Sequence, residues 1–234
     1  MTASTSRRAR PVKKSSRSSL NLWLIGAGLF FVALIGIVIY ANSRPARVAQ
    51  TTLDLPAGWV DGQALGDPNA PVTVQIWEDF LCPACQRWTS DIKPLLQSEY
   101  INTGDVRLEF HNLPLPNFEP GSVLGAQASL CAADQNTFWP YHDRLFATAQ
   151  SRGQLGFTLD ALIEEARQTG LNERDFFQCM SSQQHRPTVD ASRMEAQRLG
   201  LASTPSMFIN DIQTPNPFDY DAVKAEIDRL LNEN

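Results

Sequence analysis

The sequence predicts an α/β domain preceded by one membrane-spanning helix. Two short runs with strand-like alternation, residues 72–77 and 106–110, are each followed by segments of helical spacing. The first run leads directly into two cysteines three positions apart, and a polar helical run follows them. Near the N-terminus, residues 20–40 carry no charge and are strongly apolar. The cysteine pair therefore lies where a strand, a tight turn and a helix meet.

The first 40 residues predict a membrane anchor. Residues 1–19 contain no acid and hold six of the 20 basic residues of the chain. Residues 20–40 would span about 31 Å as a helix, which is enough to cross the core of a bilayer. The basic tail predicts a cytoplasmic N-terminus and an extracytoplasmic remainder. A cleaved signal peptide is the alternative, but its apolar run is usually only about 7–15 residues long, so we favour a retained anchor.

The rest of the chain is acidic. Residues 44–234 hold 14 Lys and Arg residues against all 25 Asp and Glu residues, a net charge of about −11. This balance argues against nucleic acid as a partner and against docking on anionic lipid. Residues 41–65 are polar and contain two prolines, which favours a linker. The turn cluster that follows would then start a folded domain at residues 66–234.

The pair Cys82 and Cys85 is the strongest chemical signal in the sequence. Cys82 lies at the start of the predicted helix, where free backbone N–H groups and the helix dipole favour thiolate over thiol. Its pKa should therefore fall below the ordinary value of about 8.5. Cys85 lies one turn further along and can close a disulfide with Cys82. One thiol can then attack while the other resolves a mixed disulfide.

Zinc binding and a purely structural disulfide are the alternatives for this pair. A zinc site needs a second pair of ligands at similar spacing. Cys131 and Cys179 are isolated, and the three histidines are scattered along the chain. His111, at the end of the second strand, is expected to be a polar strand-end residue rather than a base. We therefore favour redox chemistry and expect neither a metal ion nor another cofactor.

Residues 122–199 predict a helical region with five amphipathic segments. Cys131 and Cys179 each lie on the apolar face of their segment. Such thiols usually pair outside the cytoplasm, so we predict a structural disulfide that joins two of these helices. Closing a loop of about 49 residues would stabilise the fold by about 4 kcal/mol in the chain-entropy model. The alternative is two separate buried thiols, which behave as small apolar side chains.

The last part of the chain predicts one strand and one helix. A short apolar strand follows Thr204 and Pro205, and Asn210 with Asp211 indicates a hairpin-type turn. Residues 219–231 have the spacing of an amphipathic helix. The order of elements is thus strand, helix, strand, helical region, strand and helix.

Three phrases in this order resemble the DsbA-like branch of the thioredoxin superfamily: GDPNAPVTVQIWEDFLCPAC, FWPYHDRLF and STPSMFIN. More narrowly, the chain resembles membrane-anchored bacterial DsbA-type thiol–disulfide oxidoreductases. The resemblance covers about residues 66–231. It implies a thioredoxin fold with a helical domain inserted at about 122–199. It also implies a cis peptide bond between Thr204 and Pro205, and backbone pairing of Thr204 with a bound substrate strand.

The resemblance further implies a reaction. Cys82 takes the role of the attacking cysteine and Cys85 that of the resolving one. The expected function is to introduce disulfide bonds into reduced exported polypeptides. A membrane partner of the DsbB or vitamin K epoxide reductase type would reoxidise the pair. Two alternatives stay open: an anchored reductase or isomerase with opposite electron flow, and a non-enzymatic thioredoxin-fold module for metal delivery or binding.

Two positions depart from the pattern of the family. The dipeptide between the cysteines is Pro83-Ala84, whereas the best-known strong oxidant has a histidine second, which helps to stabilise the thiolate. We therefore expect a less oxidising potential. Thioredoxins carry a buried acid six residues before the first cysteine, and Ile76 stands there. Glu78 and Asp79 follow, in what reads as a solvated turn with one of them facing solvent, and their part in proton transfer stays open.

Overall fold

The computed structural model describes residues 24, 28–30, 32–35 and 55–233. The chain divides into two units, Met1–Arg47 and Val48–Asn234. In the first unit the described residues are helical and exposed, while the basic tail at 1–19 and most of the expected anchor at 20–40 lie outside the described residues. None of the helices that the structure describes combines the length and the apolarity needed to cross a membrane.

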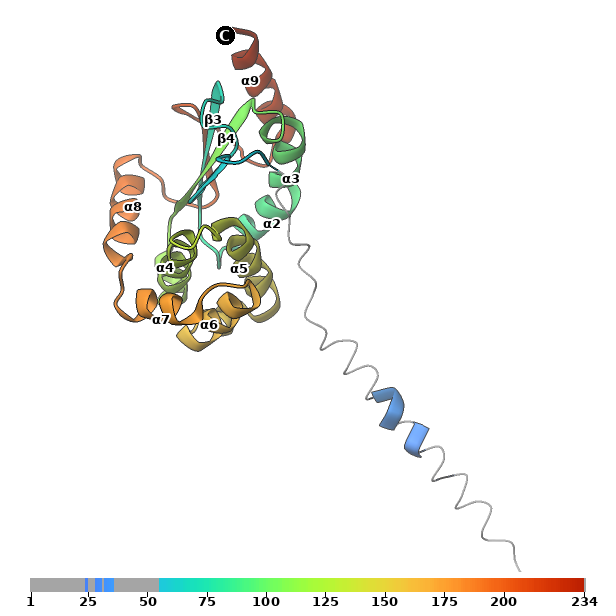
Figure 1. Cartoon of the computed structure of the whole chain (residues 1–234). Helices are drawn as coiled ribbons and strands as arrows, with labels where there is room; N and C mark the ends of the chain where they lie inside the picture. Colours follow the sequence, from blue (N-terminus) through green and yellow to red (C-terminus); the bar gives the residue numbers. More distant parts are fainter. Residues whose placement is uncertain (1–23, 25–27, 31, 36–54, 234) are drawn as a thin grey trace, which may run out of the picture. The chain divides into compact units, whose positions relative to one another are not determined.

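The second unit is built on a six-stranded sheet with the order β1-β2-β4-β3-β5-β6 (Figure 1). The strands are β1 (Val60–Asp61), β2 (Ala64–Leu65), β3 (Val72–Glu78), β4 (Val106–Asn112), β5 (Ser206–Ile209) and β6 (Ile212–Gln213). The two predicted strands, β3 and β4, pair in parallel at the centre, and β5 pairs antiparallel with β3. The expected hairpin turn at Asn210 joins β5 to β6.

The domain starts earlier in the chain than expected. Residues 60–65, assigned by composition to a linker at 41–65, form the pair β1–β2 and extend the sheet beyond β4. Leu65 is fully buried, and the Gln63 side-chain amide donates to the Phe110 carbonyl at 3.0 Å. Strands of two residues each are too short to show an alternation of apolar and polar residues, so the polar composition of this segment predicted a linker instead of strands. Residues 41–54 of the expected linker lie outside the described part of the chain.

Helices cover both faces of the sheet. One face carries α2 (Pro83–Asp91), α3 (Lys93–Leu96), the π-helical turn η1 (Gln97–Ile101) and α9 (Tyr220–Glu233), and the other carries α8 (Arg186–Arg198). Successive side chains of a strand point to opposite faces, so β3 contributes to both layers. Ile76 belongs to the main core, whereas Trp77 belongs to a smaller cluster with Ala196 of α8.

The helical region predicted at 122–199 lies between β4 and β5. It comprises α4 (Gly121–Ala133), α5 (Phe138–Arg152), α6 (Leu159–Gln168), α7 (Glu173–Ser181) and α8, with one 3₁₀ turn, η2 (Pro116–Phe118), before α4 and another, η3 (Gly153–Gly156), between α5 and α6. Thr158 and Asn172 cap α6 and α7 by accepting backbone N–H bonds. The predicted disulfide joins Cys131 of α4 to Cys179 of α7, with Cα atoms 5.9 Å apart. Figure 1 shows α4 to α7 gathered in one bundle.

Candidate active site

The redox pair follows the central strand of the sheet. β3 ends at Glu78, a four-residue turn follows, and α2 begins at Pro83. Proline suits the first helical position because its ring presets φ and its missing N–H would have no partner there. Cys82 is the N-cap residue, with extended backbone angles (φ −75°, ψ 120°), and the Gln86 N–H donates to its carbonyl at 3.1 Å. The predicted position of Cys82 at a helix N-terminus is confirmed.

Strand register brings the loop of Thr204 and Pro205 to the same place. Trp77 of β3 pairs with Ser206 of β5, so the residues before Ser206 lie beside the end of β3 and the turn after it. The Thr204–Pro205 peptide bond is cis, as the resemblance implies. The Cys82 thiol donates to the Thr204 carbonyl oxygen, with 3.5 Å between Sγ and O.

The surroundings of Cys82 favour its thiolate. The hydrogen bond from Cys85 is the largest cause that lowers the pKa of Cys82 to about 5; burial opposes the shift, and the Thr204 side chain and the N–H groups of Cys85 and Ala84 support it. Thr204 Oγ1 is buried and has no hydrogen-bond partner among the described residues. Its hydroxyl is therefore available to donate to a thiolate. The direction is the one predicted for a thiol at a helix N-terminus.

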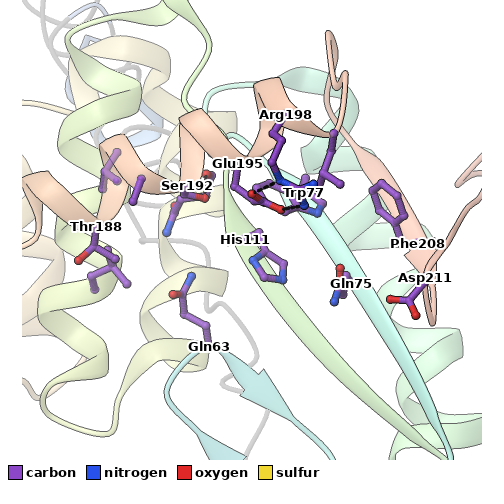
Figure 2. A pocket seen from close by; sticks show the side chains of 15 residues that line it. Gln63, Gln75, Trp77, His111, Thr188, Ser192, Glu195, Arg198, Phe208 and Asp211 are labelled. Atoms are coloured by element: carbon purple, nitrogen blue, oxygen red, sulfur yellow. Dashed lines mark hydrogen bonds and ion pairs between the residues drawn. The ribbon is translucent and has the colours of Figure 1, made fainter.

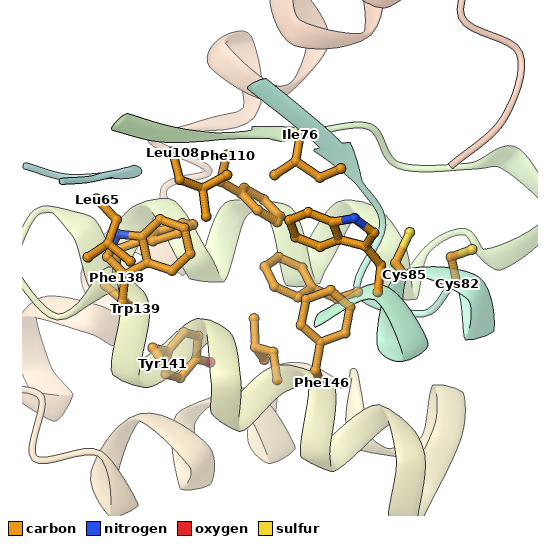
Figure 3. Packing of buried hydrophobic residues seen from close by; sticks show 14 of the residues in the cluster. Leu65, Ile76, Cys82, Cys85, Leu108, Phe110, Phe138, Trp139, Tyr141 and Phe146 are labelled. Carbon is orange, nitrogen blue, oxygen red and sulfur yellow. The ribbon is translucent and has the colours of Figure 1, made fainter. Parts of the chain in front are cut away.

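Cys85 has the opposite environment. Its side chain is fully buried and lies next to the aromatic core, whereas Cys82 lies further from that core (Figure 3). Burial, the hydrogen bond to Cys82 and the charge of Glu78 together raise the pKa of the Cys85 thiol well above its ordinary value. Both cysteines are free thiols in this structure. One of the pair is thus disposed to ionise and the other to keep its proton.

A buried carboxyl lies on the same side of the sheet as the cysteines. Glu78 follows Ile76 by two positions, so the two side chains share a face of β3. Glu78 is fully buried, Thr89 of α2 donates to its Oε2 at 3.5 Å, and its Oε1 has no partner in the described part of the chain. Burial raises the pKa of Glu78 well above its usual range, the Lys93 charge acts against this, and Cys82 adds to it. The site thus favours a protonated Glu78.

The expectation that Glu78 or Asp79 faces solvent is wrong. Asp79 is only 2% exposed and accepts hydrogen bonds of 2.7–2.8 Å from the N–H groups of Leu81 and Leu115 and from the hydroxyl of Ser122. Burial raises the pKa of Asp79 in spite of these bonds. Asp79 therefore fastens the turn before Cys82 to the segment that leads into α4, and the two acids have different tasks.

A buried group of charges connects this site to the inserted helical region. Lys93, the first residue of α3, is 6% exposed and donates to Asp143 Oδ1 of α5. His142 Nδ1 lies 2.8 Å from the same oxygen. Burial opposes ionisation of Asp143, but Lys93 and His142 outweigh it and hold the pKa of Asp143 below its usual range. Burial, helped by Lys93, lowers the pKa of His142 to about 4, so its ring is neutral.

Sequence reasoning missed this group because lysine is rarely buried and helical spacing alone does not mark Lys93 as an exception. A cavity of about 690 Å³ lies between α2, α3 and α5, and its lining includes Pro83, Thr89, Lys93 and Asp143. It gives water a way to the polar atoms beside the active-site helix.

His111 lies on the other face of the sheet. It lines a second cavity, of about 560 Å³, that α8 covers and that neither Cys82 nor Cys85 reaches (Figure 2). The His111 ring stacks on Trp77 with centroids 4.4 Å apart. Burial lowers the pKa of His111, against the charges of Glu109 and Glu195. The geometry thus agrees with the prediction that His111 is not a base for the cysteines.

A Cys-x-x-Cys pair at a helix N-terminus, beside a cis-proline loop and above a mixed sheet, defines a class: thioredoxin-fold proteins that exchange thiols and disulfides. The family model described as Thioredoxin matches residues 60–229. The chain therefore belongs to the thioredoxin family.

The relatives narrow the class further. The chain is 31% identical over 176 residues to disulfide bond formation protein D of Bacillus subtilis (strain 168), covering 74% of this chain and 78% of that protein. It is 29% identical over 220 residues to the probable disulfide bond formation protein D of Bacillus anthracis, covering 93% and 99%. The crystal structure of oxidised BdbD from B. subtilis is similar, with a TM-score of 0.68 and 29% identity over 74% of this chain and 94% of that chain. The DsbA of Chlamydia trachomatis shares the fold, with a TM-score of 0.63 and 22% identity over 74% and 92% of the two chains.

Site and relatives agree on one activity. The protein is a protein thiol–disulfide oxidoreductase of the DsbA-like type, with a thioredoxin fold and a helical insertion.

Proposed function

We propose that this oxidoreductase works as an oxidant, introducing disulfide bonds into reduced exported polypeptides through Cys82 and Cys85. The observation that carries the direction is the stabilised thiolate of Cys82. When the reduced form of such a pair is stabilised, the oxidised form readily accepts electrons. The name of the Bacillus relatives, disulfide bond formation protein D, supports the same direction.

The reaction starts from the Cys82–Cys85 disulfide. A substrate thiolate attacks Cys82 Sγ, the disulfide breaks, and Cys85 leaves as a thiolate while a mixed disulfide forms on Cys82. A second substrate thiolate then attacks the substrate sulfur of that mixed disulfide, and Cys82 leaves as the stabilised thiolate. The substrate gains a disulfide, and its two electrons reside in the reduced pair. The backbone of Thr204, which lies beside Cys82, pairs with the substrate strand during both steps.

Glu78 supplies the proton that Cys85 needs in the first step. Cys85 is fully buried, and an unpaired anion there is costly. The O–H bond of Glu78 breaks as the S–H bond of Cys85 forms, which leaves the negative charge on the Glu78 carboxylate. The nearby ammonium of Lys93 stabilises that carboxylate. Water in the cavity lined by Thr89 and Lys93 returns the proton.

The location and the partner complete the proposal. Residues 20–40 anchor the protein in the membrane, with the tail at 1–19 in the cytoplasm and the catalytic domain outside. The uncharged apolar run supports the anchor, and the six basic residues before it support its orientation. The Cys131–Cys179 disulfide suits an oxidising compartment. A membrane oxidoreductase of the DsbB or vitamin K epoxide reductase type takes the two electrons from the reduced pair.

The equilibrium potential of the pair against glutathione tests the direction. We expect a value between about −270 mV, as in thioredoxin, and about −120 mV, as in DsbA. We also expect the oxidised protein to transfer its disulfide to a reduced, unfolded ribonuclease, and the Cys82→Ser variant to lack this activity. A potential near that of thioredoxin, with faster reduction than oxidation of substrates, would assign a reductase instead.

A further inference from the structure

We propose that Asp143, in the inserted helical region, is a positioning residue for the redox pair: by neutralising Lys93 it leaves Glu78 free to carry the proton for Cys85. The proposal rests on the proposed role of Glu78 and extends it. It couples the helical insertion to the chemistry of the thioredoxin core.

Lys93 acts on two carboxyl groups at once. Its Nζ donates to Asp143 Oδ1. Thr89, which donates to Glu78, lines the same cavity as Lys93 and Asp143, so the Lys93 charge also acts on Glu78 and lowers its pKa against burial. The Lys93 side chain is only 7% exposed, and Nζ lies 5.1 Å from the centroid of the Trp139 ring. Water therefore screens this ammonium poorly, and one ammonium balances the charge of one carboxylate.

Charge balance decides which of the two acids ionises. In a buried site an unpaired charge is far more costly than a neutral group or an ion pair. The group is neutral when Lys93 and Asp143 are charged and Glu78 is protonated. The opposite shifts of the two acids follow this rule, since the pKa of Asp143 is held low and that of Glu78 is raised. Without the charge of Asp143, neutrality would require Glu78 to ionise in its place.

His142 gives Asp143 the advantage over Glu78. A carboxylate only accepts hydrogen bonds, so His142 Nδ1 carries the proton and donates to Asp143 Oδ1 at 2.8 Å. Five aromatic rings hold the imidazole, with centroids 4.9–5.8 Å from its own: Phe80, Phe110, Phe138, Trp139 and Phe146. Among the described residues, Glu78 in contrast accepts a hydrogen bond from one donor, Thr89, at 3.5 Å. In the FWPYHDRLF phrase, the histidine therefore keeps the aspartate ionised beside Lys93.

The titratable groups that act on Glu78 come from two packed elements. Lys93 acts on Glu78 from α3, Cys82 from the N-cap position of α2, and Cys85 from the first turn of α2. Asp143 and His142 of α5 act through Lys93. A change at Asp143 should therefore alter the ionisation of Glu78 without touching either thiol.

The test compares the full-length oxidised protein with Asp143→Asn, Glu78→Gln and the variant that carries both changes. Glu165→Gln is the matched control, because Glu165 is a buried carboxylate of the same insertion, paired with Arg144 and Arg152. Infrared spectroscopy at neutral pH reports the carbonyl band of protonated Glu78, identified by its loss in Glu78→Gln. Stopped-flow mixing with a reduced cysteine peptide reports the first exchange step.

We expect Asp143→Asn to lose the band and to slow exchange as much as Glu78→Gln does, by about 100-fold if Glu78 is a typical general acid. The variant with both changes should be no slower than Glu78→Gln, because Asp143 acts through Glu78. Adding Lys93→Met to Asp143→Asn removes both charges, restores neutrality with a protonated Glu78, and should bring the band back. Glu165→Gln should keep both the band and the rate.

Four outcomes would overturn the inference while the proposed role of Glu78 stands. Asp143→Asn could keep the band and the rate while Glu78→Gln is slow. The two changes could slow exchange additively, or Glu165→Gln could slow it equally, either of which would make the role of Asp143 structural. If Asp143→Asn does not fold, loss of the band in the folded Lys93→Met/Asp143→Asn variant decides against the charge balance. Wild-type exchange by Glu78→Gln would be a different result, because the proposed role of Glu78 fails there first and the inference falls with it.

Discussion

Cys82 and Cys85 are three positions apart in the sequence, yet they lie in opposite surroundings. Cys82 has the N–H groups of the first turn of α2 and the Thr204 side chain around it, which stabilise an anion. Cys85 is enclosed by apolar side chains and lies near Glu78, which stabilise the protonated thiol. Attack by a substrate on Cys82 therefore expels a sulfur that must be protonated, whereas Cys82 itself can leave as an anion.

Replacing the resolving thiol should trap the intermediate. In Cys85→Ala, a mixed disulfide on Cys82 cannot be resolved from within the protein, so it should accumulate with client polypeptides. Non-reducing gels followed by identification of the captured proteins measure this. Cys82→Ala/Cys85→Ala is the control and should capture nothing. No capture by Cys85→Ala with a reactive Cys82 would speak against exchange with polypeptides.

The thiolate should also be visible in the pH dependence of stability. The pKa of Cys82 is lowered to about 5 in the folded reduced protein, against about 8.5 when unfolded. A group whose pKa is lowered by folding contributes its full stabilisation when the pH is above its pKa in the unfolded state. This contribution is lost as the pH falls through its pKa in the folded state. The free energy of unfolding of the reduced form, minus that of the oxidised form, should thus rise between about pH 5 and 8.5. Denaturant titrations of both forms measure it, and a flat difference would contradict the assigned shift.

The sequence was sufficient to predict the lowered pKa of Cys82, but not the buried charged groups around the redox pair. A helix N-terminus is a local feature, so the lowered pKa of Cys82 could be predicted from position alone. Glu78 could have been recognised as inward, because it continues the alternation of Val74 and Ile76. The ion pair of Lys93 and Asp143 could not be predicted, because it depends on how α3 packs against α5, and no local sequence rule determines this packing.

At the scale of elements, the first turn of α2 lowers the pKa of the Cys82 thiol, and substitutions in this turn should change that pKa. Ala84 contributes a backbone N–H to the Cys82 thiolate but no side-chain donor. The dipeptide therefore offers a direct way to change the potential.

Ala84→His should make the pair more oxidising. An imidazole in the first turn can donate to the Cys82 thiolate and stabilise the reduced form, which raises the potential. We expect a rise of about 30 mV or more, equivalent to about 1.4 kcal/mol for this two-electron couple. Equilibration with glutathione measures it, and Ser90→His, on the exposed end of the same helix, is the control. An unchanged potential in Ala84→His would contradict the account of α2.

The length of a strand decides whether the sequence predicts it. β3 and β4 have seven residues each, and their period-2 pattern is visible without a structure. β1 and β2 have two residues each and exist because β4 offers them an edge. Elements that tertiary pairing creates have no signature of their own in composition.

At the scale of the whole molecule, the helical insertion is held by two cross-links. The Cys131–Cys179 disulfide closes its first and fourth helices into one loop, and Lys93 with Asp143 ties it to the active-site side of the core. The disulfide was predictable because both cysteines lie on apolar helix faces, whereas the ion pair was not.

Removing the disulfide should lower stability and spare the chemistry. We expect Cys131→Ala/Cys179→Ala to lose about 4 kcal/mol of unfolding free energy, from the greater freedom of the unfolded chain. The potential of Cys82 and Cys85 and the exchange rate should stay as in the wild type. Denaturant unfolding and glutathione equilibration measure the two quantities. Lost exchange with an unchanged unfolding midpoint would contradict a structural role.

The N-terminal segment gives a prediction for the whole chain in its membrane. A retained anchor at 20–40 should keep the full-length protein in the membrane after alkaline carbonate extraction, with residues 66–234 open to external protease. Replacing Leu29 and Val32 by arginine should release it, because charge at the centre of a span is costly. Release of the unchanged protein, together with a shortened N-terminus, would establish a cleaved signal peptide instead.

The most direct measurement is the titration of Cys82 in the reduced wild-type protein, followed by the ultraviolet absorbance of the thiolate. The wild type is required because the Cys85 thiol is itself the largest cause of the shift. We expect a transition near pH 5, and no ionisation of the Cys85 thiol before strongly alkaline pH. A first transition near pH 8.5, the value of an ordinary cysteine, would contradict it.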